Sequence, residues 1–80
     1  MDEALPVRMD FLTERRGYTL VLMRDLLGDY VVLRRWYGLA NRRGGQKQQV
    51  FMDPGLAWQE VRRIERMRER RGYRRGAVGG

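Results

Sequence analysis

Apolar and polar residues alternate over residues 7–14, so that Val7, Met9 and Phe11 fall on one side. A period of two is the pattern of a half-buried β-strand. Residues 18–24, which follow an Arg-Arg-Gly turn, are apolar, aromatic or β-branched at nearly every position. Such a segment predicts a strand that is covered, or nearly covered, on both faces.

The residues that follow predict a hairpin and one further strand. Residues 26–29 read Leu-Leu-Gly-Asp, a compact turn in which Gly28 can take a positive φ. Residues 30–36 form the second strand of the hairpin. Residues 37–45 are rich in Gly, Asn and Arg, which predicts a flexible loop. A weaker pattern over residues 46–52 predicts one more strand.

A long helix should come next. Asp53 is a good N-cap, and Pro54 fits the first helical position, where its missing N–H costs no hydrogen bond. Gly72 suits the C-cap, so the helix should end near Arg71. Apolar residues at helical spacing form the stripe expected to be buried: Ala57, Val61, Ile64 and Met67, with Leu56 and Trp58 at its edges.

These elements predict an α+β fold in one domain, because one helix stripe against one sheet face makes two layers. The sheet should be small and antiparallel, with three to four strands packed on the long C-terminal helix. The domain should span residues 7–75. We expect residues 1–6 to be a flexible lead-in and residues 76–80 to be a disordered tail.

Positive charge is concentrated in the second half of the chain. The formal net charge is +7, from 17 Lys and Arg against 10 Asp and Glu. Residues 1–33 hold four basic and six acidic side chains, whereas residues 34–80 hold thirteen basic and four acidic ones. Solubility does not require so uneven a distribution, although it remains an alternative reading. A concentrated positive field favours a polyanionic partner.

Several classes of chemistry lack their usual residues. The chain has no Cys and no His, which removes thiolate metal sites and the commonest general base. The acidic pairs Asp25 with Asp29 and Glu65 with Glu69 have no partner groups that would make an active site. We therefore expect no catalytic residues, no metal site, no cofactor and no small-molecule substrate.

The chain also carries no sign of a membrane span or an export signal. No apolar run approaches the roughly 20 residues of a transmembrane helix. The start, Met-Asp-Glu-Ala, has no basic region before an apolar stretch. A cytoplasmic location without membrane contact is the expectation.

Trp36 ends a predicted strand beside several cations. By alternation Arg34 shares its face and Arg35 points away, while Arg42 and Arg43 lie across the loop. An aromatic face among arginines can stack on a sugar or base while the guanidinium groups hold phosphates. The alternative is that Trp36 belongs to the core, as a lone strand tryptophan usually does.

Other basic and aromatic residues could extend this surface. Lys47 follows the glycines of the loop, where backbone N–H groups can also bind anions. Tyr73 and Arg74, just after the helix, could add a stacking and a phosphate contact. A solvated loop and a frayed tail are the alternatives.

The order of these motifs resembles the WGR domain family, named for a Trp-Gly-Arg turn that follows a strand and precedes a Gly-Gln segment. The resemblance covers about residues 8–75. The matching segments, in order, are Gly17-Tyr18 to Arg24, Leu26-Leu27-Gly28-Asp29-Tyr30, Trp36, Gly44-Gly45-Gln46 and Arg70-Arg71-Gly72-Tyr73-Arg74.

The resemblance implies DNA binding near strand breaks. In poly(ADP-ribose) polymerases the WGR tryptophan packs against a terminal sugar and nearby basic residues hold phosphates. In size the chain resembles the small stand-alone bacterial members of the family. Arg16 falls in a region that contacts DNA in the family. Here Tyr37-Gly38 replaces the family's Gly-Arg and the following loop is about one residue longer, so Arg42 or Arg43 would have to replace the missing guanidinium.

The leading hypothesis is a non-catalytic module that binds DNA ends, nicks or 5′-phosphates with little sequence specificity. The candidate contacts are Arg16, Arg34, Trp36, Arg42, Arg43, Lys47, Tyr73 and Arg74. RNA is a less favoured partner that needs the same residue types. The main alternative is a protein-interaction adaptor that docks an acidic partner through Trp36 and the basic loop.

Overall fold

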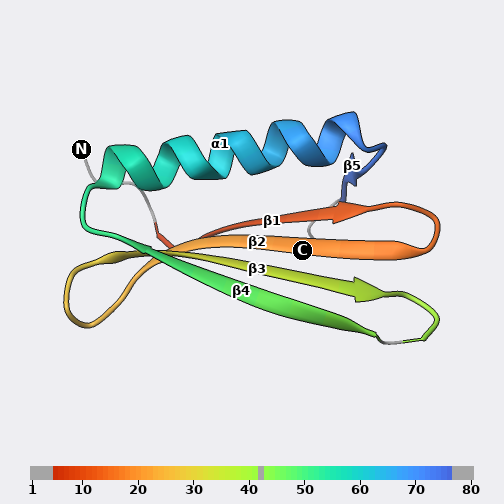
Figure 1. Ribbon diagram of the computed structural model, residues 1–80, viewed down its shortest axis with the longest axis horizontal. Helices are drawn as coiled ribbons and strands as arrows, with labels where there is room; N and C mark the ends of the chain where they lie inside the picture. The colour runs from red at the N-terminus through yellow and green to blue at the C-terminus, as the bar shows by residue number, and fades with distance from the viewer. Residues whose placement is uncertain (1–4, 42, 77–80) are drawn as a thin grey trace.

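The computed structural model describes residues 5–41 and 43–76, and it is an α+β fold of two layers (Figure 1). The fold class predicted from the sequence is confirmed. The elements are β1 (Val7–Leu12), β2 (Arg16–Arg24), β3 (Tyr30–Gly38), β4 (Gly44–Phe51), α1 (Pro54–Arg70) and β5 (Arg74–Arg75).

The five strands form one antiparallel sheet in the order β4-β3-β2-β1-β5. The long hairpin of β2 and β3 lies at its centre, paired from Arg16 with Gly38 to Arg24 with Tyr30. Turns at the two ends of this hairpin therefore lie at opposite ends of the molecule, whose longest dimension is 37 Å.

Helix α1 covers one face of the sheet. The buried side chains come from alternate positions of β1, β2 and β3 and from one stripe of α1: Phe11, Tyr18, Leu20, Leu22, Val32, Ala57, Val61 and Ile64. The predicted stripe is confirmed at its first three positions, and Met67 is half-buried. Trp58 packs against this core, whereas Leu56 is exposed.

The helix ends as its sequence predicts. The Oδ1 atom of Asp53 accepts a hydrogen bond of 2.9 Å from the backbone N–H of Gly55, and Pro54 occupies the first turn. Gly72 follows the helix with φ of +86°, a left-handed conformation that favours glycine. Gly28 has φ of +89° in the hairpin turn, which confirms that prediction as well.

The other face of the sheet has no layer over it in the described part of the chain. Val21, Met23 and Leu33 point to this open face and are half-buried. Thr19 on the same face is buried. Residues 18–24 are therefore nearly covered on their second face and not fully covered, which is the weaker of the two predicted outcomes. Within the described residues no second layer lies over this face.

Some boundaries also differ from the predictions. The loop assigned to residues 37–45 is shorter, because β3 runs to Gly38 and β4 begins at Gly44. The sequence after the helix forms β5, a fifth strand that pairs with β1. Gly76 donates a backbone hydrogen bond of 2.7 Å to Asp10, and residues 77–80 lie outside the described residues. Within the predicted lead-in, Leu5 packs against the core, and residues 1–4 lie outside the described residues.

Candidate nucleic-acid interface

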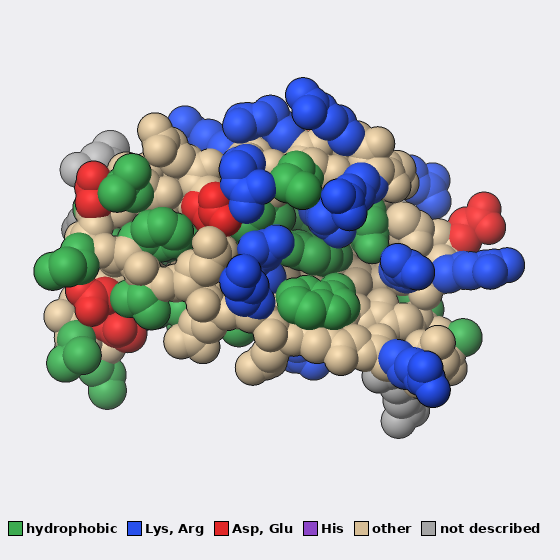
Figure 2. Space-filling model, viewed as in Figure 1, with side chains coloured by type: hydrophobic (Ala, Val, Ile, Leu, Met, Phe, Trp, Pro, Cys, Tyr) green, Lys and Arg blue, Asp and Glu red, His purple; other side chains and the backbone are tan. Residues whose placement is uncertain are grey.

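A cavity of about 780 Å³ lies on the helix side of the sheet, at the end where α1 finishes. Strands β2, β3 and β4 form its floor, and Arg68 and Tyr73 approach it from the helix and the residues that follow. In Figure 2 Lys and Arg side chains lie along the helix and toward this right-hand end of the molecule. The helix C-terminus thus completes a site that begins on the sheet.

Four aromatic residues line this cavity. Tyr18, Trp36 and Tyr73 form one group, while Tyr37 also lines a depression on the other face of the sheet. Trp36 is 40% exposed and stacks on Tyr18, with ring centroids 6.4 Å apart and an interplanar angle of 23°. Tyr73 meets Tyr18 edge-on at 6.2 Å. Tyr18 is 3% exposed, so it anchors the group in the core. Trp36 is therefore neither a core residue nor free in solvent, and the exposed part of its ring system can contact a ligand.

Arg68 packs over the rings of Tyr18 and Tyr73, and the sequence analysis did not identify it as a site residue. Its guanidinium carbon lies 4.5 Å from the ring centroid of Tyr18 and 5.2 Å from that of Tyr73. Such cation–π contacts fix the position of the charge. Its Nε is buried without a hydrogen-bond partner in the described residues. Arg68 follows Met67, the last residue of the predicted apolar stripe, and this helical position could have indicated that its side chain faces the sheet.

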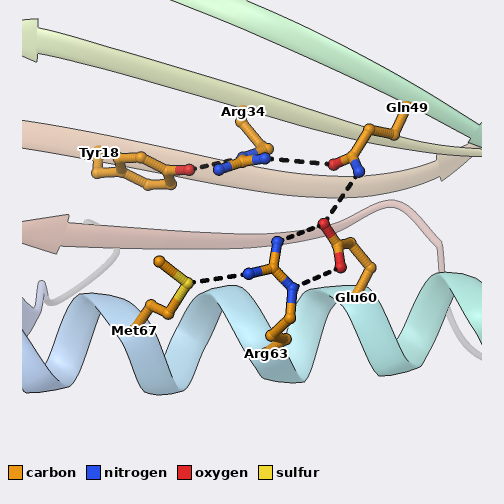
Figure 3. Close-up of polar contacts among 6 residues, drawn as sticks. All are labelled: Tyr18, Arg34, Gln49, Glu60, Arg63 and Met67. Carbon is orange, nitrogen blue, oxygen red and sulfur yellow. Dashed lines mark hydrogen bonds and ion pairs between the residues drawn. The ribbon is translucent and has the colours of Figure 1, made fainter.

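Arg34 is positioned by a chain of polar contacts (Figure 3). Its Nε donates to the hydroxyl of Tyr18 at 2.8 Å, and its Nη1 donates to Oε1 of Gln49 at 3.5 Å. Gln49 in turn donates from Nε2 to Oε2 of Glu60 at 3.0 Å. Because Glu60 accepts from the amide nitrogen, the amide oxygen of Gln49 faces Arg34. Helix α1 thereby sets the orientation of a guanidinium on the sheet.

Glu60 remains ionised over a wide pH range. Hydrogen bonds from Arg63, at 2.7 Å and 2.8 Å, outweigh the effect of burial. The Gln49 contact and the charges of Arg63 and Arg34 add to this effect, and the pKa of Glu60 falls from 4.5 to about 2. The same ion pair raises the pKa of Arg63 above its ordinary value. Glu60 is therefore a fixed negative charge behind the cavity.

Two turns are joined at the open end of this cavity. The backbone N–H of Leu39 donates to the carbonyl of Arg15 at 2.9 Å, which ties the β3–β4 loop to the β1–β2 turn. Gly38 donates to the carbonyl of Arg43 at 2.7 Å, and Oδ1 of Asn41 accepts from the Arg43 N–H at 3.0 Å. These contacts fix Gly38, Leu39 and Arg43 relative to the β1–β2 turn.

Gly44 and Gly45 lie so close to Trp36 that a side chain at either position would not fit without a shift. A Cβ on Gly45 would lie 3.0 Å from the Trp36 ring, and a Cβ on Gly44 would collide with the Trp36 carbonyl. The Gly-Gly pair therefore lets β4 lie close against β3 at the tryptophan. The sequence suggested flexibility for these glycines, whereas in the structure they belong to a strand.

The structure gathers most of the predicted site residues, though not all of them. Arg16, Arg34, Trp36, Arg43 and Tyr73 line the cavity, and Arg15 joins them without having been predicted. No acidic residue of the described chain is among its lining.

Three predicted residues lie elsewhere or cannot be placed. Lys47 pairs in register with Arg34 but is exposed and does not line the cavity. Arg74 lies in β5 and lines a separate depression with Arg15 and Arg16. Arg42 falls outside the described residues, so of the two loop arginines predicted for the site only Arg43 can be placed.

The described residues contain no cluster of three or more acidic, His or Cys side chains arranged to hold a metal ion. Across residues 5–41 and 43–76, the one helix is not both long and apolar enough to cross a membrane.

Comparison with known proteins does not assign the chain to a family. No protein-family model matches the chain, and no curated protein or solved structure is significantly similar to it.

Proposed function

We propose that this protein is a non-catalytic module that binds nucleic acid through the cavity around Trp36. The observation that carries the proposal is the lining itself: five arginines and four aromatic residues without a carboxylate among the described residues. Stacking on a base or sugar and pairing with phosphates are what this combination of groups does best.

The arrangement suits a chain of phosphates better than a single small anion. Arg15, Arg16 and Arg43 are exposed at the mouth of the cavity, whereas Arg34 and Arg68 are held inside by tyrosines. The inner pair can hold a phosphate next to the Trp36 ring, and the outer three can follow the backbone beyond it. Contacts of this kind do not read base edges, so sequence specificity should be weak.

DNA with an accessible end or nick is the favoured ligand. The Trp36 side chain is 40% exposed and already stacks on Tyr18, so its remaining surface would meet a terminal or unstacked nucleotide more readily than the stacked bases of a continuous duplex. The resemblance to WGR domains points the same way. The missing motif arginine would be replaced by Arg43 together with Arg68, which approaches the aromatic group from the helix.

The proposal is tested by titrating the protein against nicked, blunt-ended and covalently closed circular duplexes and single strands at several salt concentrations. We expect nicked and blunt-ended DNA to bind more tightly than circular DNA, and affinity to fall steeply with salt because counterions are released. Trp36→Ala should weaken binding by about 1–3 kcal/mol. Circular dichroism should show that this variant keeps its fold.

The outcomes separate the parts of the proposal. Failure to bind any of these nucleic acids at low salt would refute it and favour the adaptor alternative. Equal binding to nicked and circular DNA would remove the preference for ends. Tighter binding to single-stranded RNA than to any DNA would change the ligand but keep the site.

A further inference from the structure

The end of the molecule opposite the cavity exposes large apolar side chains. Leu26 is fully exposed, Leu27 is 87% exposed, Met52 is 86% exposed and Leu56 is 51% exposed. We call these four residues, together with the acidic residues beside them, the apolar end. Single exposed apolar residues are ordinary, but a group of this size marks a surface that contacts something.

The topology brings these residues together from three segments. Tyr30 pairs with Phe51, so the β2–β3 turn lies beside the end of β4, and α1 begins two residues after Met52. In Figure 1 this turn and the start of the helix lie at the same, left-hand end. Figure 2 shows hydrophobic side chains gathered there with acidic ones among them.

The exposure of the two leucines is built into the turn. Oδ1 of Asp25 accepts hydrogen bonds of 2.9 Å from the N–H groups of Leu27 and Asp29, and Gly28 supplies the positive φ. Arg24 closes the turn by donating to the Gly28 carbonyl at 3.2 Å. A turn fixed in this way holds the leucines out in solvent rather than letting them fold back onto the core.

The charges of the apolar end restrict its partner. Asp25 and Asp29 flank the two leucines in the turn, and Asp53 follows Met52 directly. The one basic side chain of this turn, Arg24, contacts the Gly28 carbonyl and the Tyr30 ring, so the acidic charges of the described turn outnumber it. These carboxylates would repel anionic lipids and nucleic acid, so neither a membrane surface nor DNA fits. A partner surface complementary to the apolar end would be basic and would also carry apolar side chains.

Such a surface is present at the other end of the same chain. Arg15, Arg16 and Arg43 are exposed there, and Leu39 and Trp36 are 49% and 40% exposed. We call these five residues the basic end. Since the two ends are separated by the longest dimension of the molecule, 37 Å, they cannot meet within one copy.

We propose that the apolar end docks on the basic end of a second copy, so that the chains associate head to tail. The contact is heterologous: each copy offers one end and receives the other, and the unused ends can bind further copies. Arginines of one copy pair with the aspartates of the next, while Leu26 and Leu27 pack on Leu39. Charge attraction between the ends makes the association weaker as salt increases.

The test uses two variants that each disable one end. Leu26→Ser with Leu27→Ser removes the apolar contact, and Arg15→Ser with Arg16→Ser removes the basic one. Sedimentation velocity at low salt should show that the average mass of the wild-type protein rises with concentration. Each variant alone should keep the mass of a single chain.

Mixing the two variants gives the decisive result. Their intact ends are complementary, so an equimolar mixture should form a complex of two chains that grows no further. The matched control is Arg62→Ser with Arg66→Ser, which removes two exposed helix charges outside both ends and should associate as the wild type does. Circular dichroism checks that every variant is folded.

Three results would overturn the proposal: a wild-type protein that stays a single chain up to millimolar concentration, a mixture that forms no two-chain complex, or a leucine variant that associates like the wild type. None of these measurements involves nucleic acid, so they do not depend on the function proposed above.

Discussion

Residues 34–37 place the same kinds of side chain on the two faces of the sheet. Arg34 and Trp36 point to the side of α1, whereas Arg35 and Tyr37 point to the open face. On the helix side, Arg68 and Tyr73 join them around a cavity of about 780 Å³. Within the described chain, no element covers the open face.

The two faces also differ in how their charge is balanced. The open face has a smaller cavity of about 440 Å³, which Arg8, Arg35 and Tyr37 help to line. Arg8 is already paired with Asp10 at 3.0 Å. Burial would raise the pKa of Asp10, but hydrogen bonds from Arg8 and Thr19 lower it, so this carboxylate stays charged. On the open face one of the two arginines is neutralised by a carboxylate, whereas the lining of the helix-side cavity holds five arginines and no carboxylate among the described residues.

Unfolding free energies should separate the two faces most clearly. Leu20 is 1% exposed on the helix side, and its neighbour Val21 is half-buried on the open side. Leu20→Ala should cost about 2–5 kcal/mol because it leaves a cavity, and Val21→Ala less than about 1 kcal/mol. Denaturant titration measures both. Equal losses would mean that something covers the open face in solution.

Binding to nicked DNA should respond to Arg34 and not to Arg35. Arg34→Gln removes an inner phosphate contact and should weaken binding roughly tenfold, or about 1.4 kcal/mol. The slope of log affinity against log salt should fall by about 0.9. Arg35→Gln removes the same charge from the open face and is the matched control. A similar loss in both variants would assign the binding to net charge alone.

The contacts of Glu60 with Arg63 and Gln49 predict that the free energy of unfolding depends on pH in the acid range. The folded pKa of Glu60, about 2, lies below its ordinary value of 4.5. Its stabilising contribution is therefore complete above pH 4.5 and is lost as the pH falls toward 2. Glu60→Gln should remove this part of the acid sensitivity and cost below about 1 kcal/mol at pH 7. An unchanged acid profile in the variant, followed by thermal unfolding, would contradict the assignment.

The smallest effect concerns the contact between strands at Trp36. Gly45→Ala would place a Cβ 3.0–3.2 Å from the Trp36 ring, which must then move by a few tenths of an ångström. In a Trp58→Phe background, the emission of Trp36 should shift and DNA affinity should change only a few-fold. Gln46→Ala, next along the strand and on the open face, should leave the emission unchanged.

Sequence patterns identified the hairpin, the helix caps and the buried stripe, since each depends on residues close together in the chain. They also placed Arg34 and Trp36 on one face, because strand alternation is a local property. Arg68 and Arg15 were missed because their roles depend on where α1 and the β1–β2 turn dock. Lys47 shared the correct face, but its distance from the cavity depends on the register between β3 and β4.

The hydrogen bond between Leu39 and Arg15 has an entropic consequence for ligand capture. It joins two turns that would otherwise sample conformations independently, and the Asn41 contact to Arg43 restrains the loop further. A backbone that is already ordered loses little freedom when a ligand arrives, so less of the binding free energy is spent on ordering. Arg15 and Arg43, which are exposed, are thus carried on backbone segments that hydrogen bonds already hold, and this favours tighter binding of a ligand at this surface.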